Sequence, residues 1–435
     1  MKGVARGAHF RDTPADVRPG LGVRKLRTPS AATNSRALAA IVDQAASSLQ
    51  NYAILLAGLH LLSIPIFGEF SLVYTSVPIV ITIARAWLLT PFTVGFTTAS
   101  GRERRTAIKG VCGSCLGVGL GLLCLCFVTA GLVNNKTAKG LIVSVGILMP
   151  FALFQDACRM YLFASKRGWS AAVNDGICLG TTGLVLLLWQ GEIAVHPYLL
   201  IAAWTIGTAA GSIVGLRQLG TMPSLWKPIG RLRRTRRLGL YLSGGQLVEQ
   251  SVGQLAYASV GILATAKAVG VLGTGRAVFA PVTMVLTAIS IFGLPEAVSL
   301  LRLGSTKFNR LVVLLSVLCP FLFVAYGGLL LAIPNAWTMG LFGKGVASAS
   351  ALLVPVAVWY AAVAGRQGVS IGLYALGRGR VVFWGCVGTS ILVLGVVPYS
   401  ALRWGALGAA WAYALAYGVS TPGWWLAYRR CLRTV

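Results

Sequence analysis

A small set of charged side chains interrupts long apolar stretches of this chain. If those stretches cross a membrane, a charge at a helix centre costs about 2.5 to 3.5 kcal/mol, so each charge needs a water-filled cavity or a partner. The carboxylates could bind a cation or a proton, and the planar guanidinium groups suit phosphate oxygens. The set consists of Asp43, Arg85, Asp156, Arg159, Asp175, Glu249, Glu296 and Arg366.

The three arginines of this set are the predicted ligands of a phosphate-bearing head group. Arg366 is the first choice, because it lies deepest in its apolar stretch. Each of the other two has a structural alternative. Arg85 could extend to the inner surface of the membrane, and Arg159 could pair with Asp156, three residues earlier on the same helix.

The acidic residues predict a polar cavity or an ion-coupling site. Asp43 and Glu249 are each followed by a glutamine, Gln44 and Gln250, at positions 206 residues apart. Together with Asp156, these residues could bind a coupling cation or a proton. A symmetric polar contact between the two halves of the protein is the alternative.

Two further sequence similarities share nearly this offset and predict an internal repeat. Phe67-Gly68 matches Leu272-Gly273, and Leu148-Met149-Pro150 matches Leu353-Val354-Pro355, both at an offset of 205 residues. An even number of spans in each repeat makes the two halves parallel, related by an axis along the membrane normal. We therefore expect two six-helix lobes.

Composition assigns the chain to the integral membrane proteins, because 56% of its residues are apolar, 11% are charged and its mean hydropathy is +0.76. Its apolar stretches are each near the roughly 20 residues that a helix needs to cross a bilayer. They are Ala37 to Ser63, Phe70 to Phe96, Val111 to Val133, Gly140 to Ala164, Ser170 to Trp189, Tyr198 to Leu216, Leu238 to Leu263, Val278 to Val298, Leu311 to Ile333, Ala351 to Leu376, Val381 to Val397 and Ala406 to Tyr428. We predict an all-α polytopic fold of about twelve transmembrane helices.

The basic residues set the predicted orientation of the chain. Most of the 38 lysines and arginines lie in alternate connections between the apolar stretches. By the positive-inside rule, these connections and both termini are cytoplasmic. The net charge of +28 then reflects topology and attraction to anionic lipids, and nucleic acid is not an expected partner.

The predicted domain boundaries follow the repeat and the charge distribution. They are a basic flexible cytoplasmic tail at 1–36, an N-terminal six-helix lobe at 37–216, a basic cytoplasmic interlobe linker at 217–237, a C-terminal six-helix lobe at 238–428 and a short basic cytoplasmic tail at 429–435. The linker interleaves apolar and basic residues, which is typical of a short helix on the anionic inner leaflet. A plain basic tether is the alternative.

We expect neither an enzyme nor a metal or cofactor site. Nine cysteines mostly lie in apolar stretches, and the Cys112/Cys115 pair lacks the second pair or the histidine that a metal site needs. The sequence contains no nucleotide-binding P-loop. An ion gradient, the membrane potential or the substrate gradient would therefore drive any transport.

Several motifs resemble the polysaccharide exporter family of the multidrug/oligosaccharidyl-lipid/polysaccharide flippase superfamily. They are Val42 to Tyr52, Phe67 to Leu72, Arg85-Ala86, Phe154 to Arg159, Asn174-Asp175 and Gly293 to Ala297. The resemblance covers about residues 37–428. Thr90-Pro91 departs from the family pattern, which has an acidic residue before the proline, so no coupling role is assigned there.

The resemblance implies a flippase that moves a polyprenyl-diphosphate-linked glycan to the outer leaflet by alternating access, for polysaccharide biosynthesis. Its site would be the plasma membrane of a bacterium, and the composition is similar to that of actinobacterial proteins. Membrane lipids, H⁺ or Na⁺ and glycan-assembly enzymes would be its partners. Two alternatives stay open: a cation-coupled multidrug exporter of the same fold with an acidic, aromatic-lined cavity, and a non-transporting scaffold whose charges only pair with one another.

Overall fold

The computed structural model describes residues 31–89, 92, 101–224, 232–343 and 345–433. These residues form helices with short connections, and no strand occurs among them. The first group contains α1 (Ala31–Leu61), α2 (Ile64–Ala84), the π-helix η1 (Arg85–Leu89), α4 (Gly101–Leu132), α5 (Lys136–Ala164), α6 (Gly168–Leu188), α7 (Gln190–Ile193) and α8 (Tyr198–Leu219). The second group contains α9 (Leu232–Leu263), α10 (Ala266–Val278), α11 (Ala280–Leu303), α12 (Ser305–Ala332), α13 (Asn335–Phe342), α14 (Val346–Ala349), the short 3₁₀ turn η2 (Ser350–Leu352), α15 (Leu353–Gly365), α16 (Gln367–Ala375) and α17 (Gly379–Leu432).

Nine helices in the described part of the chain are long and apolar enough to cross a membrane. α1 and α9 are not among them, although they have 31 and 32 residues, because polar side chains such as Asp43 and Glu249 interrupt their apolar surface. α17 is counted once, yet its backbone leaves the helical conformation at Gly405, with φ 59° and ψ −140°, where the eleventh and twelfth predicted spans separate. The all-helical polytopic fold is confirmed, and the number of crossings stays a prediction.

Several predicted boundaries were wrong. The second span starts at Ile64 and not at Phe70, because Pro65 is well suited to the first turn of a helix. The eighth predicted span, Val278 to Val298, corresponds to α11, which α10 precedes; the two helices meet at Phe279, two residues before Pro281. Ala31–Arg36 belongs to α1 and not to a flexible tail, whereas residues 1–30 and 225–231 of the predicted tail and linker lie outside the described residues.

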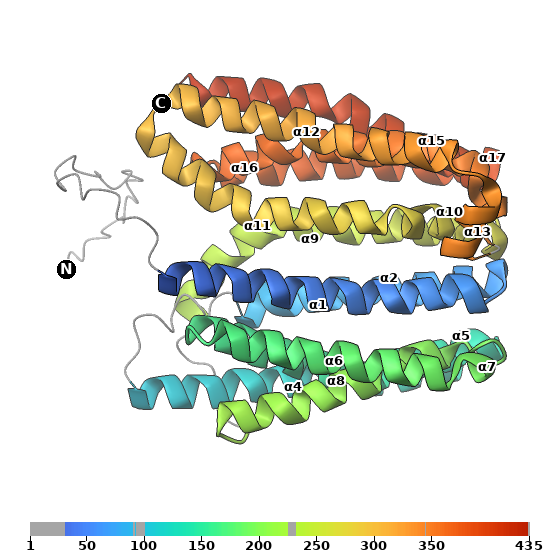
Figure 1. Cartoon of the computed structure of the whole chain (residues 1–435), viewed down its shortest axis with the longest axis horizontal. Helices are drawn as coiled ribbons and strands as arrows, with labels where there is room; N and C mark the ends of the chain where they lie inside the picture. The colour runs from blue at the N-terminus through green and yellow to red at the C-terminus, as the bar shows by residue number, and fades with distance from the viewer. Residues whose placement is uncertain (1–30, 90–91, 93–100, 225–231, 344, 434–435) are drawn as a thin grey trace, which may run out of the picture.

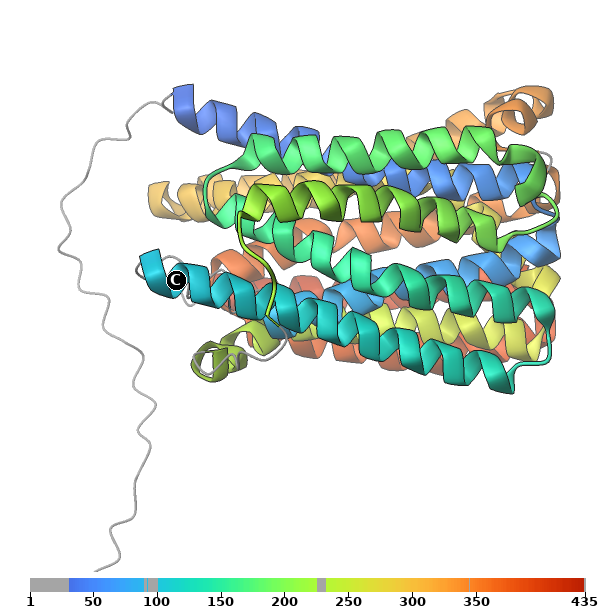
Figure 2. The ribbon, with the colours of Figure 1, turned by 90° about the horizontal axis from the view of Figure 1, so that it is seen from below.

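The two groups of helices lie side by side, and their helices run along the long axis of the molecule. In Figure 1 the second group, yellow to red, lies above the first, blue to green, and α1 and α2 are the helices of the first group that face the second. Figure 2 shows α4, α5, α6 and α8, cyan to light green, covering one face of the bundle. Each group has its own apolar core, with Ile54, Phe70 and Leu148 buried in the first and Val260 and Phe323 in the second.

The groups touch most closely where α2 crosses α10. A Cβ atom on Gly68 would lie 2.4 Å from the carbonyl oxygen of Ala266, and one on Gly270 would lie 2.0 Å from that of Ile64. Only glycine allows two helix backbones to approach this closely. The crossing lies at the end of the bundle opposite to the start of α1 and the end of α17, which is the predicted outer end (Figure 1).

Candidate functional site

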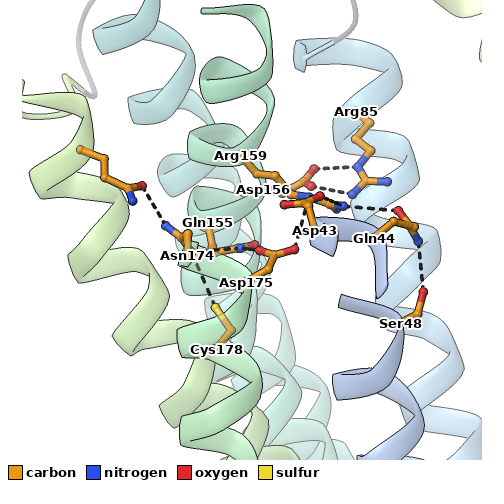
Figure 3. A network of polar contacts seen from close by, with 11 residues as sticks. Asp43, Gln44, Ser48, Arg85, Gln155, Asp156, Arg159, Asn174, Asp175 and Cys178 are labelled. Carbon is orange, nitrogen blue, oxygen red and sulfur yellow. Dashed lines mark hydrogen bonds and ion pairs between the residues drawn. The ribbon is translucent and has the colours of Figure 1, made fainter. Parts of the chain in front are cut away.

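The buried charges of the first group form one network between α1, η1, α5 and α6 (Figure 3). Arg159 on α5 donates hydrogen bonds to Asp43 on α1, one of them from Nε at 2.7 Å, and to Gln44 at 3.3 Å. The same guanidinium lies 3.4 Å from Asp175 on α6, which also accepts a 2.5 Å hydrogen bond from Gln155. Two carboxylates therefore share one guanidinium.

Arg85 binds the remaining carboxylate of this network. It stands at the start of the π-helix η1 and forms a two-pronged ion pair with Asp156, at 2.6 and 2.8 Å. π-helical turns are rare and frequently occur at functional sites. The Arg85 side chain is 42% exposed whereas Asp156 is 5% exposed, so one face of the guanidinium stays accessible while the other neutralises a buried charge.

In the second group, Arg366 and Glu249 form the corresponding pair. Arg366 stands at the junction of α15 and α16 and donates a 2.5 Å hydrogen bond to Glu249 on α9. Arg366 also donates to Thr389 at 3.1 Å, and its guanidinium lies over the rings of Tyr417 and Trp424, 4.6 and 5.1 Å from their centres. This arginine is held on several sides.

These pairings correct two expectations from the sequence. Asp156 and Arg159 bind partners on other helices instead of each other. Asp43 and Glu249 each pair within their own group of helices, so they do not form the symmetric contact between the two halves.

A cavity of about 1050 Å³ lies between the two groups. Its walls come from α2 and η1 of the first group and from α9, α10, α11, α15, α16 and α17 of the second. Among the predicted site residues, Arg85, Arg366, Glu249 and Gln250 line it, and Gln250 accepts a 3.1 Å hydrogen bond from Thr82 across the two groups. Arg159, Asp43, Gln44 and Asp156 belong to the network of the first group and are not part of this lining.

Arg276 is a cavity residue that the sequence reasoning missed. It falls in the connection between the seventh and eighth predicted spans, Leu238 to Leu263 and Val278 to Val298, but it lies near the end of α10 and lines the cavity. Its guanidinium lies over the ring of Tyr257, 4.5 Å from the ring centre, and Tyr360 and Tyr413 are close by. No carboxylate of the described residues forms an ion pair with it. The glycines of α10 shortened the apparent span and hid this position.

Aromatic side chains form much of the remaining wall. Trp359 stacks between Tyr360 and Tyr413, with ring centres 5.0 and 4.1 Å apart, and all three line the cavity. Three arginines against one glutamate therefore give the described lining a positive balance in an aromatic setting. Such a cavity can hold an anionic group and a ring-bearing or apolar portion of the same molecule.

No protein-family model and no curated protein sequence matches the chain. Several solved structures match the chain in fold. An inward-facing multidrug resistance MATE family transporter of the MOP superfamily matches with a TM-score of 0.62 at 12% identity, covering 91% of this chain and 98% of the other. The lipid II flippase MurJ, in an inward closed conformation, matches with a TM-score of 0.60 at 14% identity and covers 90% and 87%. The MATE transporter DinF-BH in complex with R6G matches with a TM-score of 0.62 at 14% identity, over 93% and 97%.

This chain shares the fold of these transporters. The match extends over nine-tenths of the chain, so it includes both groups of helices and the cavity between them. At 12 to 14% identity these matches establish the fold alone, and the substrate has to be argued from the cavity.

Proposed function

We propose that the protein is an alternating-access flippase that moves an anionic, lipid-linked oligosaccharide from the inner to the outer leaflet of a bacterial plasma membrane. The observation that carries the proposal is the cationic central cavity between the two groups of helices. Arg85, Arg276 and Arg366 line it, and Glu249 is the one carboxylate among the described lining residues. Guanidinium groups in a cavity shielded from bulk water bind phosphate oxygens strongly.

The three arginines are suited to different tasks. Arg366 donates from both terminal nitrogens, to Glu249 and Thr389, and lies over two aromatic rings, so only its buried Nε lacks a partner among the described residues and its main contribution is a fixed positive charge. Arg276 has no carboxylate partner among the described residues and is the better candidate for direct contact with a diphosphate. Arg85, exposed on one side, would receive the head group at the inner end of the cavity.

The contacts at the outer end support an inward-facing state. Ser71 on α2 and Tyr257 on α9 are hydrogen-bonded at 2.5 Å, and Tyr257 donates to the carbonyl oxygen of Val269 on α10. The cavity lining begins one turn further along α2, at Thr75. In the proposed cycle, opening of this contact and closure of the inner end would expose the cavity to the outer leaflet.

The network around Arg159 is the proposed source of coupling. Asp43 and Asp175 share its guanidinium, and the Oδ1 atom of Asp43 is buried without a hydrogen-bond partner among the described residues. The excess negative charge suits H⁺ or Na⁺, so we propose ion coupling through these two carboxylates.

A cation-coupled multidrug exporter is the second candidate function. Two observations favour it: the aromatic wall built from Trp359, Tyr360 and Tyr413, and the similarity to MATE transporters at TM-scores as high as that to MurJ. The positive balance of the cavity opposes it, because a cationic drug would meet three guanidinium groups.

Reconstitution of the full chain in liposomes tests the two candidates. The probes are a fluorescent polyprenyl-diphosphate disaccharide and rhodamine 6G, each with and without an imposed pH or Na⁺ gradient. We expect movement of the diphosphate lipid, slowed about tenfold or more by Arg276→Gln, since a charge-assisted hydrogen bond contributes about 1.5 to 3 kcal/mol. Arg403→Gln, an exposed arginine outside the cavity lining, is the matched control and should have little effect.

Three other results of this experiment would contradict the proposal in different ways. Export of rhodamine 6G without movement of the diphosphate lipid would replace the proposal by the drug exporter. Movement of neither probe by well-folded protein would favour a non-transporting scaffold. Equal slowing by Arg276→Gln and Arg403→Gln would remove Arg276 from the proposed binding site.

A further inference from the structure

Glu69 is a membrane-embedded carboxylate that the sequence reasoning passed over, because the second span was expected to begin one residue later. In the structure Glu69 lies on the second turn of α2, inside a candidate membrane span that begins at Ile64. One of its oxygens, Oε1, accepts a 3.0 Å hydrogen bond from Asn135, in the connection between α4 and α5. The other, Oε2, is buried without a hydrogen-bond partner among the described residues.

The carboxylate lies at a second cavity, of about 540 Å³, between the two groups of helices. Its walls come from α2, α4 and α5 on one side and from α9 and α10 on the other. They are mainly apolar, and Ser76 and Gln254 are their other polar members. This outer cavity shares no residue with the central cavity apart from Gln254.

Glu69, whose Oε2 atom is buried, differs from the carboxylates of the two charged networks in lacking a cation. Asp43, Asp156, Asp175 and Glu249 are each ion-paired with an arginine, whereas no ion pair of Glu69 occurs among the described residues. An ionised carboxylate with an unpartnered oxygen in an apolar cavity is costly, and bound charge of opposite sign removes most of that cost.

Among the described residues, none of the charged or titratable groups on the surrounding helices forms an ion pair with Glu69. They are His60 on α1, Cys126 on α4, Lys136 and Lys139 on α5, and Lys267 on α10, while the lining part of α9 contributes only the neutral Gln254. The three lysines are exposed and form no ion pair with Glu69 among the described residues, and His60 binds the carbonyl oxygens of Leu56 and Gly340.

The position of Glu69 connects this cavity to the closure of the outer end. Its neighbour Gly68 packs against the backbone of Ala266 and Gly270 at the α2–α10 crossing, and Ala266 also lines the outer cavity. Separation of α2 from α10 would therefore remove one wall of the cavity and expose Glu69 to water. A cation that binds the closed form more tightly than the open form would shift the equilibrium toward closure.

We propose that Glu69 and the outer cavity form a binding site for a small monovalent cation, H⁺ or Na⁺, that stabilises the closed outer contact between α2 and α10. The proposal rests on the proposed transport function for its role in a cycle, but the binding itself does not depend on the substrate. It is separate from coupling at Asp43 and Asp175, which lie in the network around Arg159.

Binding can be tested on the purified full chain with the apolar reagent dicyclohexylcarbodiimide, which modifies protonated carboxyl groups in apolar surroundings. Mass spectrometry of the peptides would measure modification of Glu69 as a function of pH and of NaCl against choline chloride. Glu69→Gln is the matched variant, because it keeps an acceptor for Asn135 and removes the charge. Glu192, exposed in the short helix α7, is the internal control.

We expect Glu69 to be modified at least several-fold more than Glu192. A rise in modification at lower pH that NaCl does not alter would identify H⁺ as the ligand, and protection by NaCl but not by choline chloride would identify Na⁺. Modification equal to that of Glu192 at every pH, with no protection by NaCl, would overturn the proposal.

Thermal unfolding gives a second readout that does not depend on transport. Wild type should melt at a higher temperature when the identified cation is added, whereas Glu69→Gln should lose that response, because a ligand of the folded state alone raises stability with its concentration. An equal response of both proteins would overturn the assignment to Glu69. If neither lipid nor drug moved in liposomes while Glu69 still bound the cation, the transport proposal would fail and the site would stand.

Discussion

Glu249 and Arg366 repeat, in the second group of helices, the pairing of Asp43 with Arg159 in the first. Glu249 follows Asp43 by 206 residues and Arg366 follows Arg159 by 207. An acid on the first long helix of each group therefore binds an arginine on a later helix of the same group. The repeat predicted from the sequence agrees with this relationship, since it places Asp43 and Glu249 at matching positions.

The buried pair of the second group should show strong coupling between its members. Glu249→Ala or Arg366→Ala alone leaves one buried charge without its partner, which costs about 3 to 5 kcal/mol of stability. The double variant should be more stable than the sum of the single losses predicts, with an interaction energy of about 0.5 to 3 kcal/mol. Thermal or denaturant unfolding of the four proteins in detergent measures this cycle, and additive losses would contradict the pairing.

Removal of Arg159 should be more damaging than removal of Arg85. Arg159 neutralises Asp43 and Asp175 together and is 13% exposed, whereas Arg85 serves one carboxylate and is 42% exposed. We expect Arg159→Ala to lower the free energy of unfolding by about 3 to 5 kcal/mol and Arg85→Ala by less. The exposed Arg403→Ala provides the baseline for both in the same unfolding measurement. Equal losses of unfolding free energy in Arg159→Ala and Arg85→Ala would show that the sharing of Arg159 by two carboxylates adds nothing to stability.

The sequence predicted the helical class and the charged residues, but not what those residues bind. Apolar stretches of about 20 residues make a membrane helix recognisable, and a charge within one is conspicuous. The partner of Arg159 depends on how α1, α5 and α6 pack, and no spacing along one helix contains that information. The local prediction for Asp156 and Arg159 failed because contacts between helices outweighed a pair on one helix.

Two cavity residues were missed for a related reason. Arg276 stands on the glycine-rich helix α10, which lies outside the predicted spans, and Glu69 stands one residue before Phe70, the predicted start of the second span. In both places tight packing of α2 against α10 extends helical structure beyond the apolar run. Gly68 and Gly270 were the available sequence signal for this crossing, since small residues mark close helix crossings in membranes.

A methyl group at the α2–α10 crossing should prevent closure of the outer end. The Cβ of Gly270→Ala would lie 2.0 Å from the carbonyl oxygen of Ile64. Because that oxygen belongs to the backbone of α2 and cannot rotate away like a side chain, the two helices must move apart. We expect folded protein with transport reduced about tenfold or more and with faster amide hydrogen exchange in the first turns of α2 and in α10. Gly183→Ala on α6 is the matched control, because its Cβ would have no described neighbour within 4 Å. Unchanged transport and exchange in Gly270→Ala would show that the crossing does not act as the outer gate.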